Sequence, residues 1–200
     1  MRIGLLGGTF DPIHNGHLLV GESVQEYLEL GSVVFIPAGR PWLKADKQVS
    51  ISEHRLAMAE LAVEGHPAFS VSRVEIDRPG PTYTVDTLEQ MRRDLGPEVE
   101  LYLVLGMDSL RELSRWRRPE NLFALCTVVG VSRPGYDDIV PTWLDEIVDG
   151  ASERVKLLRG PQSNTSGTEV RERASRGEAL GSLVPKAVEA YILEHGLYRF

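Results

Sequence analysis

Short apolar runs that end at glycine, proline or polar residues recur along the whole chain. Their leucine-rich and β-branched composition is typical of parallel strands that are buried on both faces. They predict strands at 3–6, 33–36, 101–105, 127–131 and 154–158. Residues 69–76 instead alternate between apolar and polar positions, which predicts a strand with one solvent-facing side, nearer an edge of the sheet.

Segments with the helical spacing of apolar residues lie between these runs. They predict helices at 15–30, 52–64, 84–95, 120–125, 141–148 and 185–194, with Asn15, Ser52 and Thr84 as N-caps. Strands that alternate with helices favour a parallel sheet covered on both faces. We therefore expect an α/β fold, a single doubly wound Rossmann-like domain over residues 1–200 with a mostly parallel sheet.

The turn after the first strand has the features of a phosphate site. Gly7 and Gly8 end the strand, and the absence of a Cβ lets a ligand approach the backbone. A helix N-terminus follows, whose N–H groups and dipole favour anions. His14 and His17 flank that helix start, where imidazole donates to phosphate oxygens or carries positive charge. The alternative is a loop with two solvated histidines; the spacing is not that of a zinc-protease helix.

A second hydroxyl-rich helix start lies near the other end of the chain. Ser166 or Thr168 is placed to cap it, and Arg171 follows one turn later. The functional interpretation is a second phosphate site with arginine supplying charge. Helix capping plus surface charge explains the same stretch. We expect residues 164–200 to be helical and to carry this second motif.

Other candidate residues follow strands or begin helices, and each has a plain structural alternative. Asp108 follows the strand at 101–105, where an acid accepts from ribose hydroxyls, holds a metal-bound water or only caps a helix. Trp116 stands among arginines, which suits stacking on a charged ring but equally suits surface packing. Lys44 lies in a polar loop whose alternative interpretation is solvated surface, and Arg55 is expected to be a surface charge.

Composition limits the class of protein. The net charge of −7 argues against broad attraction to nucleic acid, although it permits a local basic pocket. Cys126 is the single cysteine, so no internal disulfide forms, and its strand pattern favours a core residue over a nucleophile. No signal-peptide pattern or apolar run of membrane-spanning length is present, so we expect a cytoplasmic protein that binds no membrane. Neither a P-loop nor a Gly-x-Gly-x-x-Gly turn occurs, which disfavours P-loop NTPases and dinucleotide-dependent dehydrogenases.

Two motifs resemble those of a known superfamily. The first turn resembles the signature of the nucleotidylyltransferases with an HxGH motif, here Gly7-Gly8-Thr9-Phe10-Asp11-Pro12-Ile13-His14-x-Gly16-His17. The superfamily's second signature, Ser-x-Thr-x-Ile/Val-Arg, is matched by Ser166, Thr168, Val170 and Arg171. More narrowly, the chain resembles bacterial nicotinate-nucleotide adenylyltransferases over residues 3–198, through Tyr83-Thr84, Gly106-x-Asp108, Trp116, Arg133-Pro134-Gly135 and Gly196-Leu197-Tyr198.

This resemblance implies transfer of AMP from ATP to nicotinate mononucleotide, giving deamido-NAD and pyrophosphate. It implies catalytic roles for His14, His17 and Arg171. It implies ATP binding by Gly7, Gly8, Thr9, Phe10, Gly16, Lys44, Gly106, Asp108, Arg133, Ser166 and Thr168. Acceptor binding falls to Tyr83, Thr84 and Trp116. Mg²⁺ is expected to enter with ATP, held by nucleotide oxygens and water rather than by protein side chains.

The sequence departs from the resembled family at one loop and leaves alternatives open. Residues 41–44 read Pro-Trp-Leu-Lys where the family usually has Pro-Pro-His-Lys, so the histidine is missing and Lys44 is retained. A sister transferase that makes dephospho-coenzyme A or a CDP-alcohol is the rival enzyme. A nucleotide-binding regulator without catalysis is the rival from another class. The partners expected are ATP and nicotinate mononucleotide, with a homo-oligomer possible and the preference for acid over amide resting on the resemblance alone.

Overall fold

The computed structural model describes residues 1–41, 49–132, 142–161 and 163–199. The predictions for Lys44, Arg133 and the altered Trp42-Leu43 dipeptide lie outside the described residues.

The core is a six-stranded sheet in the order β3-β2-β1-β4-β5-β6, and every pair of neighbouring strands is parallel. The strands are β1 (Arg2–Gly8), β2 (Ser32–Pro37), β3 (Phe69–Val71), β4 (Glu100–Gly106), β5 (Thr127–Ser132) and β6 (Val155–Arg159). The chain moves outward from β1 in one direction and then from β4 in the other, so the topology reverses between these two neighbours. The predicted doubly wound, Rossmann-like α/β fold is confirmed.

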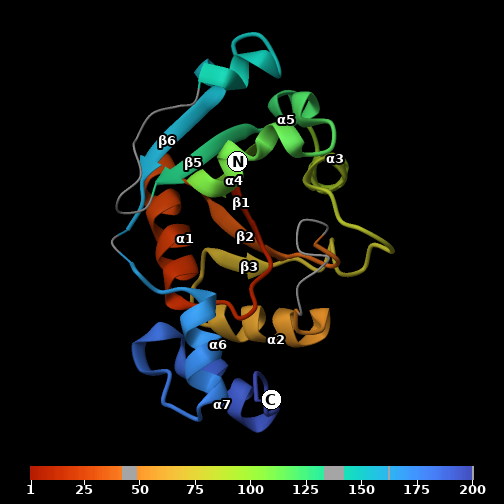
Figure 1. Ribbon diagram of the computed structural model, residues 1–200. Helices are drawn as coiled ribbons and strands as arrows, with labels where there is room; N and C mark the ends of the chain where they lie inside the picture. The colour runs from red at the N-terminus through yellow and green to blue at the C-terminus, as the bar shows by residue number, and fades with distance from the viewer. Residues whose placement is uncertain (42–48, 133–141, 162, 200) are drawn as a thin grey trace.

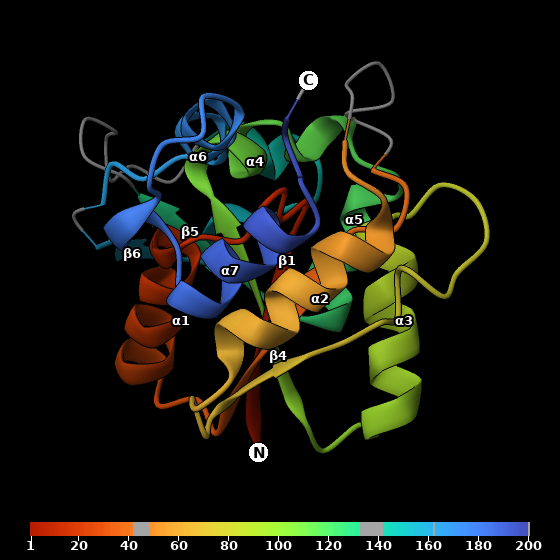
Figure 2. The ribbon, with the colours of Figure 1, turned by 90° about the horizontal axis from the view of Figure 1, so that it is seen from below.

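Helices cover both faces of this sheet (Figures 1 and 2). They are α1 (Asn15–Leu28), α2 (Ser52–Val63), α3 (Thr84–Leu95), α4 (Met107–Arg111), α5 (Pro119–Leu125), α6 (Gly167–Ser175) and α7 (Lys186–Glu194). Short 3₁₀ turns occur at Leu113–Arg115, Thr142–Glu146, Ser152–Arg154 and Gly181–Leu183. In Figure 1 α1 lies on the opposite side of the sheet from α3 and α5, and α7 packs beside α2, as Figure 2 also shows.

The alternation of side chains along each strand divides the core in two. Ile3 and Leu5 of β1 pack with α3, α4 and α5, whereas Leu6 packs with α1, α2, α6 and α7. Along β4, Leu103 joins the first cluster and Val104 the second. Because successive strand residues point to opposite faces, a continuous apolar run buries both sides of the sheet.

Two predicted elements are shorter or of another type. The run at 69–76 forms a strand only over Phe69–Val71, although its predicted place at an edge of the sheet is confirmed. The chain then turns so that Glu75 becomes buried and accepts a hydrogen bond from Thr87. The helix predicted at 141–148 is a 3₁₀ turn, Thr142–Glu146.

Three of the predicted N-caps are displaced by one position. His14, Ile51 and Tyr83 precede the first turns of α1, α2 and α3, so the predicted capping residues are the first helical residues. Asn15 instead uses its side-chain amide to donate to the Ser182 carbonyl at 2.6 Å. The prediction for α6 is confirmed, because Ser166 accepts a 3.2 Å hydrogen bond from the N–H of Glu169.

Candidate active site

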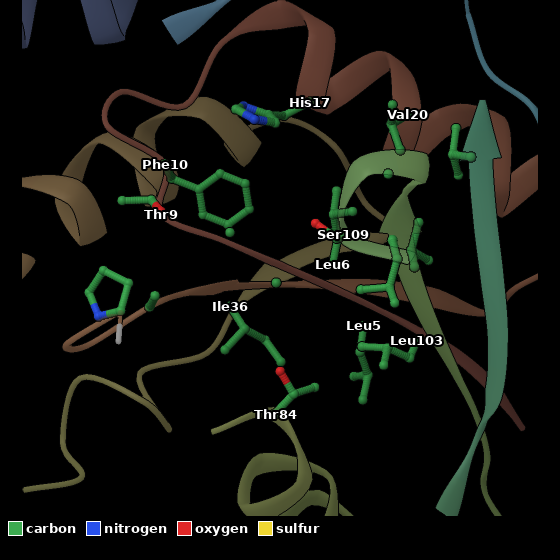
Figure 3. Close-up of a pocket in the computed structure, with 18 of the residues that line it drawn as sticks. Leu5, Leu6, Thr9, Phe10, His17, Val20, Ile36, Thr84, Leu103 and Ser109 are labelled. Atoms are coloured by element: carbon green, nitrogen blue, oxygen red, sulfur yellow. The ribbon is translucent and has the colours of Figure 1, made fainter. Parts of the chain in front are cut away.

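A cavity of about 410 Å³ opens where β1 and β4 end. This is the point at which the strand order reverses, the usual ligand site of open parallel sheets. Predicted site residues in its lining are Gly7, Gly8, Thr9, Phe10, His14, Gly16, His17, Tyr83, Thr84, Gly106, Asp108 and Trp116. In Figure 3 the His17 ring lies on one side of the cavity and Thr84, at the start of α3, on the other.

The two glycines that end β1 serve different purposes. A Cβ on Gly7 would meet nothing within 4 Å, so this residue leaves open backbone facing the cavity. A Cβ on Gly8 would lie 2.8 Å from the Phe10 ring, which is buried and packs edge-on against His17 at 4.9 Å. Gly7 therefore leaves room for the close approach that was predicted at both glycines, whereas Gly8 makes room for Phe10.

The two histidines form a stacked pair at the start of α1. Their ring centroids are 3.7 Å apart with an interplanar angle of 20°. The backbone N–H of His14 donates to Nδ1 of His17 at 3.2 Å. A neutral His17 ring with an accepting Nδ1 carries its hydrogen on Nε2, so it presents a donor at that atom. His14 is buried and His17 is half-buried in the cavity wall.

Gly16 allows this pair to approach the segment before α6. A Cβ at Gly16 would lie 3.1 Å from Nδ1 of His14 and 3.2 Å from the Ser163 hydroxyl. Ser163 and Thr165 also line the cavity. The residue between the two histidines is thus small because side chains from both ends of the chain converge there.

The second predicted motif docks on the first. Nη1 of Arg171 donates to the backbone carbonyl of Asp11 at 2.7 Å, and Nη2 to the Thr168 hydroxyl at 3.4 Å. Arg171, Ser166 and Thr168 are absent from the described lining of the cavity, although Thr165 belongs to it. The structure therefore brings the two sequence motifs together, with the second motif at the rim rather than in the wall.

The opposite wall is built from the start of α3 and the turn before α5. Tyr83 precedes the first helical turn and Thr84 begins it, so the N–H groups of α3 point to this side of the cavity. The guanidinium carbon of Arg117 lies 4.8 Å from the centre of the Tyr83 ring. Trp116 is half-buried in the same wall, and Asp108 is exposed at its edge. Asp108 lies within α4, whose N-cap is Gly106, so the capping alternative for Asp108 is wrong.

Arg55 is the largest departure from the sequence-based expectation, because it is only 1% exposed. Its guanidinium donates to three backbone carbonyls: Nη1 to Thr9 at 2.7 Å, Nε to Ser50 at 2.9 Å and Nη2 to Gly39 at 3.1 Å. Burial lowers the pKa of Arg55, an effect that the charge of nearby Asp11 opposes. Arg55 thus joins the turns after β1 and β2, and no periodicity in the helix pattern signals it.

The buried carboxyl group of Glu75, next to α3, was also not predicted from the sequence. Glu75 lines the cavity and accepts a 2.9 Å hydrogen bond from Thr87, whose hydroxyl accepts another at 2.9 Å from Nη1 of Arg78. Burial raises the pKa of Glu75, against the opposing effects of its hydrogen bonds and of Arg78. This network connects the loop after β3 to the first turn of α3.

Cys126 lies outside the cavity lining and follows α5. Burial raises the pKa of its thiol to about 12, so the thiol stays protonated near neutral pH. A protonated thiol is a poor nucleophile, which agrees with the structural interpretation of this residue.

Neither a cluster of metal-ligating side chains nor a helix fit to cross a membrane occurs in the described part of the chain. Within those residues, no group of three or more histidine, cysteine or acidic side chains is arranged to hold a metal ion. Over the same residues, no helix combines the length and apolar character that crossing a membrane requires.

The fold and the site define a nucleotide-binding α/β domain of the nucleotidyltransferase class. A family model described as cytidylyltransferase-like matches residues 5–173. A relative from Roseiflexus sp. (strain RS-1) is 49% identical over 197 residues, covering 98% of each chain. One from Dehalococcoides mccartyi (strain ATCC BAA-2266) is 44% identical over 198 residues, covering 99% of this chain and 97% of its own. Both are named "Probable nicotinate-nucleotide adenylyltransferase", and the chain belongs to that family within the cytidylyltransferase-like proteins.

Solved structures agree on the fold. Plasmodium falciparum nicotinic acid mononucleotide adenylyltransferase complexed with NaAD has a TM-score of 0.77 at 18% identity, covering 98% of this chain and 97% of its own. The same protein complexed with APC has a TM-score of 0.74 at 17% identity, covering 98% and 96%.

Proposed function

We propose that the protein transfers AMP from ATP to nicotinate mononucleotide, forming nicotinate adenine dinucleotide and pyrophosphate in NAD biosynthesis. The observation that carries the proposal is a cavity whose lining includes the first residues of two helices, α1 and α3. His17 lies on one side and Thr84, at the start of α3, on the other, and the glycine turn, Tyr83 and Trp116 also line this cavity. The near full-length relatives, which carry the name of this activity, support it.

The reaction requires positioning and charge stabilisation more than proton transfer. A phosphate monoester of the acceptor attacks the α-phosphorus of ATP in line, a P–O bond forms, and the bond to pyrophosphate breaks. The attacking phosphate is already an anion, so no protein base is needed to activate it. Donors aimed at the charge that develops on the α-phosphate lower the barrier.

His17 suits that role because its Nδ1 accepts from the His14 backbone N–H, so a neutral His17 ring carries its hydrogen on Nε2. In this proposal His17 stabilises the developing charge, and His14 orients it by stacking at 3.7 Å. Gly7, with open backbone, admits the phosphates closely, while Gly8, Thr9 and Phe10 shape the turn. Gly16 keeps the histidines close to the second motif.

The remaining ATP contacts come from more distant segments. Arg171, with Ser166 and Thr168 at the start of α6, neutralises the departing pyrophosphate from the rim. Gly106, where a Cβ would meet nothing within 4 Å, gives open backbone at the end of β4, and Asp108 beside it accepts from a ribose hydroxyl. Lys44 and Arg133 are proposed as further phosphate ligands on the resemblance alone.

The acceptor occupies the α3 side. The first N–H groups of α3 around Thr84 suit a carboxylate for the same reason that a helix start suits phosphate. Trp116 and Tyr83 offer aromatic faces for a pyridinium ring, and stacking of this kind is favourable for a cationic ring.

Magnesium fits this site as part of the nucleotide. Because no ligand cluster occurs among the described residues, we propose that Mg²⁺ is coordinated by ATP oxygens and water, as is usual for this ion. Bound in that way, it would offset phosphate charge and so favour departure of pyrophosphate. The cytoplasmic location, the single domain with its helical 164–200 part, and a homo-oligomer stay predictions.

One assay tests the proposal. Purified protein is incubated with ATP, Mg²⁺ and each of several acceptors, and pyrophosphate release is measured with and without EDTA. We expect turnover with nicotinate mononucleotide that EDTA abolishes. Turnover with phosphopantetheine, or with CTP and an alcohol phosphate, would identify a sister transferase instead. ATP binding without turnover of any acceptor would identify a nucleotide-binding regulator.

A further inference from the structure

The arginines around Trp116 have different environments, although the sequence presents them as one basic cluster. Arg115 pairs with Glu112 at 3.1 Å on the surface. Arg118 contacts Asp86 at 2.6 Å and Glu89 at 3.0 Å. Arg117 lines the cavity, and among the described residues it has no carboxylate partner. Its charge is therefore available to a ligand in a way that the charges of Arg115 and Arg118 are not.

The stacking of Arg117 on Tyr83 directs this charge. The guanidinium carbon lies 4.8 Å from the centre of the Tyr83 ring, and Tyr83 is the residue that precedes the first turn of α3. A guanidinium that stacks on an aromatic face keeps its edge N–H groups available for planar acceptors such as carboxylates. Arg117 is exposed, so it moves with little steric cost.

Two positive features of this end of α3 remain available to an anion. Asp86 lies in the first turn and would repel a carboxylate, but Arg118 contacts its Oδ1 at 2.6 Å and offsets part of its charge, which Arg118 also does for Glu89. The helix N-terminus and the Arg117 guanidinium are the positive features of this wall that are not committed to these carboxylates. Thr84 and Arg117 then lie on the same side of the cavity as Trp116.

We propose that the Arg117 side chain is a specificity-determining group that favours an acceptor bearing a ring carboxylate over the uncharged carboxamide counterpart. The inference rests on the proposed function, because it assigns the acceptor's carboxylate to a charged side chain in addition to the α3 N–H groups. It also explains how the chain distinguishes two acceptors of nearly equal size. An exposed cation discriminates less than a buried one, so we expect about tenfold discrimination from this residue.

The test compares acceptor kinetics of Arg117→Gln with those of the matched control Arg115→Gln. Steady-state kcat/KM is measured with nicotinate mononucleotide and with nicotinamide mononucleotide at saturating ATP. For R117Q we expect about a tenfold fall with the acid, little change with the amide, and an unchanged KM for ATP. R115Q should behave as the wild type, because Arg115 points its charge to Glu112. Arg117→Lys should retain part of the discrimination, since it keeps the charge without the stacked planar fork.

Salt gives a second readout. Raising the ionic strength should reduce the wild-type preference for the acid and leave the R117Q preference unchanged, because a partly exposed charge pair is screened. An R117Q enzyme with the wild-type acid-to-amide ratio would overturn the inference while leaving the proposed function intact. A wild-type enzyme that turns over neither acceptor would overturn the proposed function itself.

Discussion

The Tyr198 hydroxyl donates a 2.8 Å hydrogen bond to Oδ1 of Asp11, a residue 187 positions earlier in the chain. Both residues are buried. Asp11 also accepts from the Ser50 N–H through Oδ2, and its carbonyl accepts from Arg171. The loop that carries the first sequence motif is thus hydrogen-bonded to Ser50, Arg171 and Tyr198, which come from three distant segments. Positioning of the His14–His17 pair is in this way a long-range property of the fold.

The substitution Tyr198→Phe tests whether the hydrogen bond to Asp11 stabilises the protein. Burial, together with Asp11, raises the pKa of Tyr198, so the hydroxyl remains a donor throughout the neutral range. Its loss leaves Asp11 short of one donor, and we expect the free energy of unfolding to fall by about 1–3 kcal/mol in urea titrations. Tyr27→Phe is the matched control, because Tyr27 is 62% exposed. Equal stability of the two variants would show that the Asp11 contact contributes nothing.

Arg55→Met should be more damaging. The substitution leaves the carbonyls of Thr9, Ser50 and Gly39 without their shared donor, although methionine fills a similar volume. We expect a loss of about 3–5 kcal/mol in the free energy of unfolding, again by urea titration. Arg93→Met, on the exposed side of α3, should change stability by less than about 0.5 kcal/mol. If R55M lowered the free energy of unfolding as little as R93M, water molecules would be satisfying the three carbonyls in place of the guanidinium.

Gly7→Ala and Gly8→Ala form a matched pair of one-methyl additions. The methyl group at Gly7 enters open space in the cavity, so we expect near-normal stability with ATP binding weakened about tenfold or more, roughly 1.4 kcal/mol. The methyl group at Gly8 meets the Phe10 ring at 2.8 Å, so stability should fall by about 1–3 kcal/mol. Thermal melts and ATP titrations measure both effects. Reversal of the two phenotypes would contradict the assigned roles.

His17→Ala should lower kcat much more than ATP affinity. A donor aimed at developing charge contributes mainly to the transition state, so its removal should cost about 100- to 1000-fold in kcat and only a few-fold in ATP Kd. Rapid-quench turnover and equilibrium titration separate the two quantities. His195→Ala, in an exposed position at the end of α7, serves as the control. Comparable losses in kcat and ATP affinity would make His17 a ground-state ligand.

We expect the effect of Glu75→Gln on the free energy of unfolding to depend on pH. Burial raises the pKa of Glu75 in the folded protein, so the unfolded chain releases this proton first as the pH rises. Ionisation therefore lowers the free energy of unfolding as the pH rises from about 4.5, the ordinary pKa of this carboxyl group, to the raised pKa of the folded protein, and glutamine avoids this cost. The stability of the variant relative to wild type should increase between pH 4.5 and pH 7.5 in urea titrations. A difference that is constant or decreases over this range would refute the assigned burial effect.

The strand pattern was sufficient to predict the fold because it has a local cause. Apolar runs such as Leu101–Leu105 must be buried on both faces, and the glycines and polar residues that end them mark the edge of the sheet where a cavity forms. Arg55 could not be predicted in the same way. Three carbonyls from separate loops converge on it only in the folded chain, while its place in the sequence resembles that of any surface arginine.

Predictions that depended on the detailed path of a loop also failed. The alternating run at 69–76 leaves the sheet after Val71 because a buried hydrogen bond between Glu75 and Thr87 draws it toward α3. The sequence alone does not distinguish Arg117 from Arg115 and Arg118. The structure does, because Arg115 and Arg118 form ion pairs. Thr87 lies 12 positions from Glu75, and Asp86 lies 32 positions from Arg118, and residue patterns do not encode partners at such separations. Arg115 differs, because its partner Glu112 is only three residues away.

The bond between Asp11 and Tyr198 also orders events during biosynthesis. At a translation rate of about 5–20 residues per second, roughly 10–40 s separate the appearance of these two residues, which are 187 positions apart. For that interval a nascent chain carries the complete glycine turn and histidine pair without the donor that fastens their loop. A polypeptide that ends before residue 198 would therefore contain the glycine turn and the histidine pair but lack the Tyr198 hydroxyl that donates to Asp11. The hydrogen bond to Asp11 therefore forms only after residue 198 has been synthesised.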